Sequence, residues 1–131
     1  MKKVRLLNTS KQTILGESVE VARSAAERNK GLLGREGLDP GTGLWIVGTE
    51  AVHTFWMKFA IDLVFLDRKR CVTKVVPALK PFRMGMSWRA SSVVELPAGA
   101  AAEAGTERGD QIESHDCLRA EPRAEQAPVA V

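Results

Sequence analysis

Two carboxylates, Asp62 and Glu95, stand out in this sequence because each interrupts an otherwise apolar segment. A carboxylate forced into a partly buried position either pairs with a cation or has its pKa shifted. Two such groups facing one cleft, within about 10 Å of each other, are the arrangement used in acid–base hydrolysis. The pattern therefore supports one hypothesis, a carboxylate-based hydrolase or lyase that uses Asp62 and Glu95.

The cations available to these carboxylates give a second interpretation. Arg28, Arg35 and Lys58 could form ion pairs with them, or the carboxylates could bind backbone amides and hold a helix against a sheet. Structural networks perturb pKa values as active sites do, and we favour the structural interpretation for Asp62 and Glu95.

Large side chains gather nearby in the sequence, at Trp45, Phe55, Trp56 and Met57. Core packing is the default interpretation, because these side chains bury the most area per residue. Strand alternation nevertheless directs Phe55 and Met57 to one face and Trp56 to the other, so one set could line a cleft. An aromatic wall with a few polar groups at its rim suits a small polar ligand such as a sugar.

The candidate ligand-binding residues are Arg35, His53, Trp56, Lys58, Asp62 and Glu95. No nucleophile lies beside a base in a recognisable motif, so we assign no catalytic residue. The leading hypothesis is a non-catalytic β-rich module that binds a small, sugar-like ligand or a partner, rather than an enzyme. A third hypothesis is a protein–protein interaction domain, which would use the apolar residues of the 81–88 loop: Pro81, Phe82, Met84, Met86 and Trp88.

The sequence offers no residue set for a metal or a cofactor, and we expect neither. Its two histidines, His53 and His115, are too few for a typical zinc site, and Cys71 and Cys117 form no CxxC motif. Its glycines fit neither the GxGxxG pattern nor the P-loop pattern of phosphate-binding loops.

Composition and charge limit the classes of partner that we expect for this protein. The formal charge of +3 is scattered and aromatic residues make up 5% of the chain, so a nucleic-acid partner is not expected. Arg5, Asn8 and Lys11 interrupt any apolar leader, and no apolar run approaches the roughly 20 residues of a membrane span. We therefore expect a cytoplasmic protein with reduced cysteines and no membrane partner, its oligomeric state left open.

Segments rich in β-formers predict strands at residues 3–7, 18–21, 44–47, 52–57, 61–66, 71–76, 92–96 and 110–114. The first two would be joined by a bend near Leu15 and Gly16. The segment 61–66 is apolar on both faces, which predicts a strand covered by protein on both sides.

A helix is predicted from the capping box formed by Ser24 and Glu27, running to about Leu33 with Gly34 as its C-cap. The fold class is therefore mainly β (a β-rich α+β domain), a sandwich or partly closed barrel with one N-terminal helix packed on the sheet. We assign residues 1–117 to this single domain. Residues 118–131 lose periodicity and are predicted to be a disordered tail.

Several short motifs then follow in a fixed order: GLLGR at residues 31–35, FWMK at 55–58, IDLVFLD at 61–67 and ELPAG at 95–99. Together they resemble the domain-of-unknown-function 192 family over about residues 19–112. The resemblance implies a compact β-rich fold with an N-terminal helix and no established activity. Where the family usually reads FWMKNT, this chain has Phe59 and Ala60. Many relatives carry a secretory leader or a lipid anchor, and we expect neither here.

Overall fold

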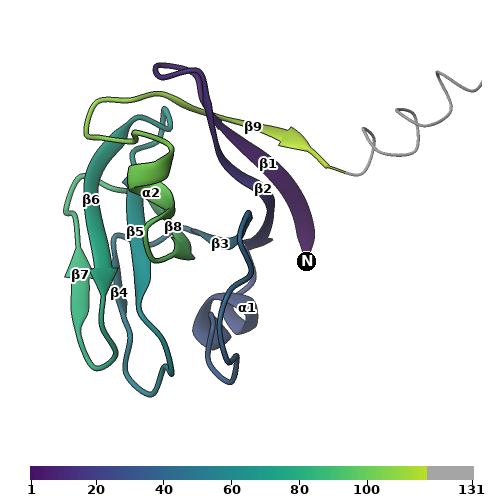
Figure 1. The fold of residues 1–131 in the computed structure, drawn as a ribbon. Coiled ribbons are helices and arrows are strands. Elements are labelled where there is room, and N and C mark those ends of the chain that lie inside the picture. The colour runs from purple at the N-terminus through teal and green to yellow at the C-terminus, as the bar shows by residue number, and fades with distance from the viewer. Residues whose placement is uncertain (118–131) are drawn as a thin grey trace, which may run out of the picture.

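The computed structural model describes residues 1–117, which form a seven-stranded mixed sheet and a separate two-stranded sheet (Figure 1). The strands of the large sheet, in spatial order, are β6 (Val72–Leu79), β5 (Ile61–Leu66), β8 (Ser92–Pro97), β3 (Thr42–Val47), β2 (Thr13–Ala22), β1 (Lys2–Asn8) and β9 (Ile112–Asp116). The small sheet pairs β4 (Ala51–His53) with β7 (Met84–Met86), and two short helices complete the fold, α1 (Ala25–Lys30) and α2 (Ala100–Glu103). The mainly β class predicted from the sequence is confirmed.

The large sheet is open but curled, and its two edge strands approach each other at one end. There Cys71 forms an isolated bridge with Gln111, and the amide of Val72 donates to the carbonyl of Asp110 at 2.8 Å. Among the described strands only β2 and β3 run parallel as neighbours, and every other neighbouring pair is antiparallel. The chain must therefore cross back between β2 and β3, and α1 lies in this crossover (Figure 1).

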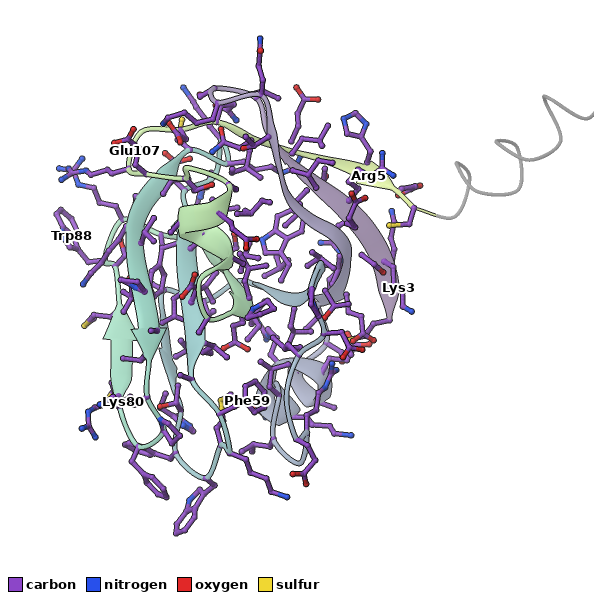
Figure 2. All side chains as sticks on the ribbon, in the orientation of Figure 1. Lys3, Arg5, Phe59, Lys80, Trp88 and Glu107 are labelled. Atoms are coloured by element: carbon purple, nitrogen blue, oxygen red, sulfur yellow. The ribbon has the colours of Figure 1, made fainter. Side chains whose placement is uncertain are left out.

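Two apolar cores lie on the two faces of the sheet. The inner core takes side chains from all seven strands, from Ala101 of α2 and from Ala104, the C-cap of that helix. The outer core lies under the crossover and under the β4–β7 ribbon, and includes Leu32 and Met57. The ribbon packs so closely that a Cβ atom on Gly85 would lie 2.6 Å from Cδ1 of Leu63. Figure 2 shows the side chains that fill the space between α2 and the sheet.

The strand β5 lies between these cores, and all six of its residues are buried. Val64 and Leu66 belong to the inner core, and Leu63 and Phe65 belong to the outer core. The prediction of a strand covered on both sides is confirmed, because an apolar run without alternation needs protein on each face.

Several local boundaries differ from the sequence prediction, and β7 was not predicted as a strand. β2 continues through Leu15 and Gly16, although its register with β1 shifts there, and the turn lies at residues 9–12, where Gln12 has a φ of 59°. The capping box forms as predicted, but the helix ends at Lys30 with Gly31 as its C-cap. The predicted strand 52–57 stops at His53, because the next residue, Thr54, bonds across to another loop.

The helices play a small part in the fold. α1 has no buried residue. Leu32, which follows the helix, is the buried residue by which the crossover packs on the outer core. Neither helix of residues 1–117 has the length and apolar character needed to cross a membrane. The tail predicted for residues 118–131 lies outside the described residues.

Candidate functional site

A cavity of about 400 Å³ opens between the crossover and β4. One wall is the last turn of α1 and the residues that follow it, 28–33. The facing wall is formed by Gly48, Thr49, Ala51, Val52 and His53. Three further lining residues are buried, Ile46, Met57 and Glu95, and we call them the floor of the cavity. The cavity therefore combines apolar surface with a single acidic side chain, which is the usual make-up of a small-ligand site.

Glu95 is the one acidic side chain that lines this cavity. Its side chain is 3% exposed, and no hydrogen-bond donor among residues 1–117 contacts its carboxyl group. Among residues 1–117 no side-chain nitrogen or oxygen is both wholly buried and without a hydrogen-bond partner, so the Glu95 oxygens that no donor contacts reach the surface of the cavity. The cavity is the direction from which a partner can reach this carboxyl.

The protonation of Glu95 reflects the same environment. Burial raises the pKa of the Glu95 carboxyl from its ordinary value to about 7, and the positive charge of Arg35 offsets only part of this effect. Arg35 itself donates to Glu20 at 2.9 Å, so its guanidinium is already committed to another carboxylate. Near neutral pH the Glu95 carboxyl therefore exists in both protonation states and can act as donor or acceptor.

The position of Glu95 follows from strand register. It stands opposite Leu44 of β3 on one side and opposite Leu63 of β5 on the other. Directly opposed residues share a face of the sheet, so Glu95 lies on the outer face with these two leucines. Glu20 is also opposite Leu44, which places Glu20, and the Arg35 bound to it, in the same row.

The wall formed by the crossover is held by Arg28. Its guanidinium Nη1 donates to the carbonyl of Val47 at 3.2 Å and to that of Gly48 at 3.4 Å. A Cβ atom on Gly48 would lie 2.7 Å from Arg28 Nη1, so the contact needs a glycine there, and the φ of 84° suits glycine as well. The capping box at Ser24 fixes the start of the helix that carries Arg28.

Asp62 lies on the other face of the sheet. It stands opposite Leu96, which belongs to the inner core, and its carboxylate accepts from the amides of Ala78 at 2.8 Å, Gly99 at 3.1 Å and Ala101 at 2.9 Å. These three bonds tie β5 to β6 and to the start of α2. The hypothesis that Asp62 and Glu95 share one cleft is wrong, because strand alternation sends them to opposite faces.

The remaining predicted ligand-binding residues divide between the cavity and the surface. His53 lines the cavity together with Glu95, and Arg35 acts on Glu95 through its charge. Trp56 is 74% exposed and Lys58 pairs with Glu36 at 2.7 Å, and neither lines the cavity. The expected aromatic wall does not form there, since Trp45 belongs to the inner core.

Sequence reasoning missed several lining residues. The most informative are Leu32 and Leu33 on one wall, and Ala51 and Val52 on the other. The first two lie within the motif GLLGR, which could have indicated this wall. Ala51 and Val52 carried no signal, because nothing in their types distinguishes a cavity wall from an ordinary short strand.

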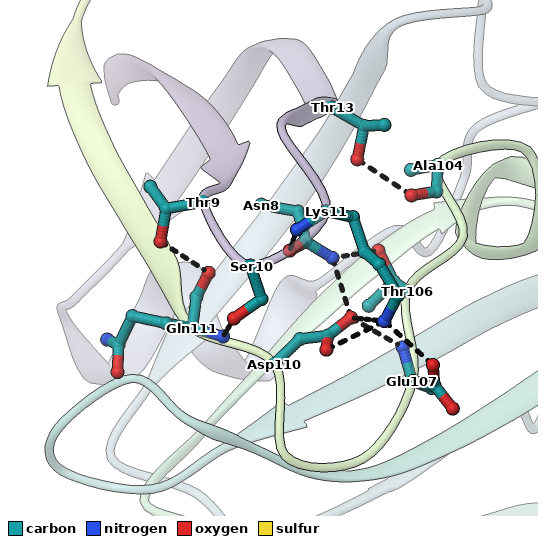
Figure 3. A network of polar contacts seen from close by, with 10 residues as sticks. All are labelled: Asn8, Thr9, Ser10, Lys11, Thr13, Ala104, Thr106, Glu107, Asp110 and Gln111. Carbon is teal, nitrogen blue, oxygen red and sulfur yellow. Dashed lines mark hydrogen bonds and ion pairs between the residues drawn. The ribbon is translucent and has the colours of Figure 1, made fainter.

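A larger polar cluster elsewhere is fully satisfied. The buried Asn8 donates to Thr106 at 3.0 Å and to Asp110 at 2.9 Å, and Lys11 binds both Asp110 and Glu107 (Figure 3). Burial opposes ionisation of Asp110, but the hydrogen bonds from Asn8, Lys11 and the backbone amide of Glu107 outweigh it and lower its pKa. This network joins the β1–β2 turn to residues 104–111 and offers no unmet group to a ligand.

A second depression and the search for metal ligands leave the Glu95 cavity as the candidate site. A depression of about 960 Å³ lies between β6 and Trp88, but its one carboxylate, Asp67, already accepts from the amides of Lys69 and Cys71. Within residues 1–117 no three His, Cys, Asp or Glu side chains gather as metal ligands.

Comparison with known proteins adds a family and a fold. The family DUF192, described as an uncharacterised ACR family, matches residues 6–114. A UPF0127 protein of Pyrococcus abyssi is 31% identical over 115 residues, which cover 82% of this chain and 95% of the relative.

Two crystal structures have a similar fold. One is a proposed transcription regulator of Sinorhizobium meliloti, with a TM-score of 0.75, 22% identity, and 86% of this chain and 92% of that chain covered. The other is a protein of unknown function from Novosphingobium aromaticivorans, with a TM-score of 0.71, 24% identity, and 85% and 83% covered. At these identities the likeness extends to the fold alone.

Proposed function

This chain belongs to the DUF192 family, which is uncharacterised, and we propose a function for it from the geometry of its own cavity. The proposed function is that of a non-catalytic module that binds a small, neutral or acidic, sugar-like ligand between the crossover and β4. The observation that carries the proposal is the Glu95 carboxyl, buried at the floor of the cavity and contacted by no donor among the described residues.

The charges around the cavity define the ligand further. Arg28, Lys30 and His53 lie on its walls, and Glu95 is its only acidic residue. A hydroxyl group suits the floor, because it can donate to the ionised carboxyl or accept from the protonated one. A cationic ligand would meet Arg28 and Lys30 at close range, whereas a ligand with a carboxylate would gain from them.

The two other hypotheses have less support. A hydrolase or lyase would need a second catalytic group in place of Asp62, whose carboxylate is bound to three amides on the far face. A protein-interaction surface at 81–88 agrees with the exposure of four of its residues: Phe82, Met84, Met86 and Trp88. It does not explain why an acidic side chain, Glu95, lines a cavity elsewhere. As part of the proposal the protein works in the cytoplasm, where the Cys71 thiol stays reduced and donates to Gln111.

The test is a thermal-shift titration of the full chain with glucose, glucuronate and glucosamine. We expect glucose or glucuronate to raise Tm by several degrees at about 100 times its Kd, and glucosamine to bind more weakly. Glu95→Gln should abolish the shift, and Glu103→Gln, at an exposed position, should keep it. Absence of any shift with the wild-type chain, or an equal shift with Glu95→Gln, would contradict the proposal.

A further inference from the structure

Two loops meet at one end of the molecule and are fastened together by one buried residue. The loop between β4 and β5 and the loop between β6 and β7 lie at the same end of the fold (Figure 1). Thr54, which is fully buried, donates through its hydroxyl to the carbonyl of Lys80 at 2.6 Å, and its amide donates to the carbonyl of Arg83 at 2.8 Å. The amides of Phe82 and Arg83 donate back to Thr54, so the loops form one unit.

This unit presents three aromatic rings to solvent, which we call the aromatic tip: Phe55, Trp56 and Phe82. Their exposed fractions are 39%, 74% and 51%. Phe82 stacks on Phe55 with 6.3 Å between ring centroids and meets Trp56 edge-on at 5.2 Å. None of the three lines the Glu95 cavity, although Phe55 also stacks on the cavity-lining His53 with 4.8 Å between ring centroids. Exposed apolar rings gathered at one place indicate a contact outside the chain.

The backbone under the aromatic tip adds a second observation. Trp56 has a φ of 68° and Phe82 a φ of 63°, in the left-handed region that bulky residues rarely adopt. Such conformations persist where the surrounding structure enforces them, and they gather at functional sites. Here the hydrogen bonds of Thr54 enforce them, and the result is to hold two large rings in water.

The charge around the aromatic tip is predominantly positive. Lys58, Lys80 and Arg83 are exposed on the two loops, and Lys80 lies at this end of the molecule (Figure 2). Every charged residue between positions 68 and 94 is a Lys or Arg. Neither Lys80 nor Arg83 has an ion-pair partner within residues 1–117, so their charges are available to an anionic surface.

We propose that the aromatic tip, together with Lys80 and Arg83, docks this protein on the surface of an anionic lipid membrane. Trp and Phe favour the interface between headgroups and acyl chains, and nearby Lys and Arg are attracted to anionic headgroups. Single-stranded nucleic acid fits less well, because the three rings gather against one another instead of standing apart along a groove where successive bases could stack. This proposal departs from the sequence-based expectation of no membrane partner, which rested on the lack of an apolar run long enough to span a membrane.

Co-sedimentation of the full chain with lipid vesicles tests the proposal. We expect binding to vesicles of phosphatidylcholine mixed with phosphatidylglycerol and little binding to phosphatidylcholine alone. Replacing both Trp56 and Phe82 by Ala should weaken binding roughly tenfold or more, and so should Lys80→Glu with Arg83→Glu.

Matched controls separate the aromatic tip from general surface effects. Trp88 is also 74% exposed but lies away from Lys80 (Figure 2), so Trp88→Ala should leave vesicle binding unchanged. Lys3→Glu with Lys69→Glu removes the same charge elsewhere and should weaken binding less than the Lys80 and Arg83 pair. Equal loss in tip and control variants, no binding to anionic vesicles, or binding to a single-stranded oligonucleotide in place of vesicles would overturn the proposal.

Discussion

Asp62 and Glu95 lie on neighbouring strands, one residue out of direct opposition, and their side chains leave the sheet on opposite faces. Asp62 receives three backbone amides on the inner side, whereas Glu95 receives no donor from residues 1–117 on the outer side. Two acidic residues that look alike in the sequence therefore have different roles. One is a structural tie, and the other is the candidate ligand contact.

Ionisation of Glu95 should make the protein less stable as pH rises. Its pKa is raised to about 7 in the folded state, so the folded protein binds a proton more tightly than the unfolded chain between the ordinary pKa of 4.5 and about 7. The free energy of unfolding should therefore fall by up to about 3 kcal/mol across this range. Urea denaturation from about pH 4 to about pH 8 measures it. Glu95→Gln should lose this decline and Glu103→Gln should retain it, and parallel curves for Glu95→Gln and the wild-type chain would refute the assignment.

Removal of the Asp62 carboxylate should lower the stability of the fold and leave ligand binding in the Glu95 cavity unchanged. Asp62→Ala leaves the amides of Ala78, Gly99 and Ala101 without their acceptor, and we expect a loss of about 3 kcal/mol in the free energy of unfolding. Asp67→Ala, which removes an acceptor from an exposed turn, should cost about 1 kcal/mol. Chemical denaturation compares the two variants, and equal costs would show that burial of the Asp62 contacts matters little.

The polar network at Asp110 should give stability that is lost in acid. Because the pKa of Asp110 is lowered below its ordinary value of 3.8, its contribution is fully present above about pH 4 and disappears as pH falls through the folded-state pKa. Asp110→Asn should lower stability at neutral pH by about 1–3 kcal/mol, since the charged bond to Lys11 is lost. It should also flatten the acid limb of a stability–pH curve, and an unchanged acid limb would exclude this role.

A methyl group at Gly43 should disturb the pairing of β3 with β8. Its Cβ would lie 2.6 Å from the carbonyl oxygen of Glu95 and 2.8 Å from Cδ2 of Leu96. The backbone oxygen cannot move without shifting the strand, so Gly43→Ala should cost about 2–3 kcal/mol of unfolding free energy. A Cβ atom on Gly37 would meet no other atom within 4 Å, so Gly37→Ala is the control and should be near neutral. Similar melting temperatures for both variants would contradict the expected clash.

Residue types were sufficient to predict the centre of the fold. The apolar run 61–66 lacks alternation, and this alone required cover on both faces. The capping box at Ser24 and Glu27 likewise acts over three residues, so it could be identified without tertiary information.

The errors came from contacts between distant segments. The strand predicted at 52–57 ends early because Thr54 bonds to Lys80 and Arg83, which lie far along the chain. The face on which Asp62 or Glu95 lies depends on strand register, which no local pattern specifies. His53 and Glu95 were both predicted as candidate residues, but the cavity that brings them together depends on the crossover, which the sequence did not indicate.

The parallel pairing of β2 with β3 has a consequence for how such a protein can change. The crossover forms one whole wall of the cavity, yet it contributes no strand to the sheet. Its length and composition can therefore vary while the scaffold persists, so related chains could keep one architecture and acquire different ligands by remodelling this single arm.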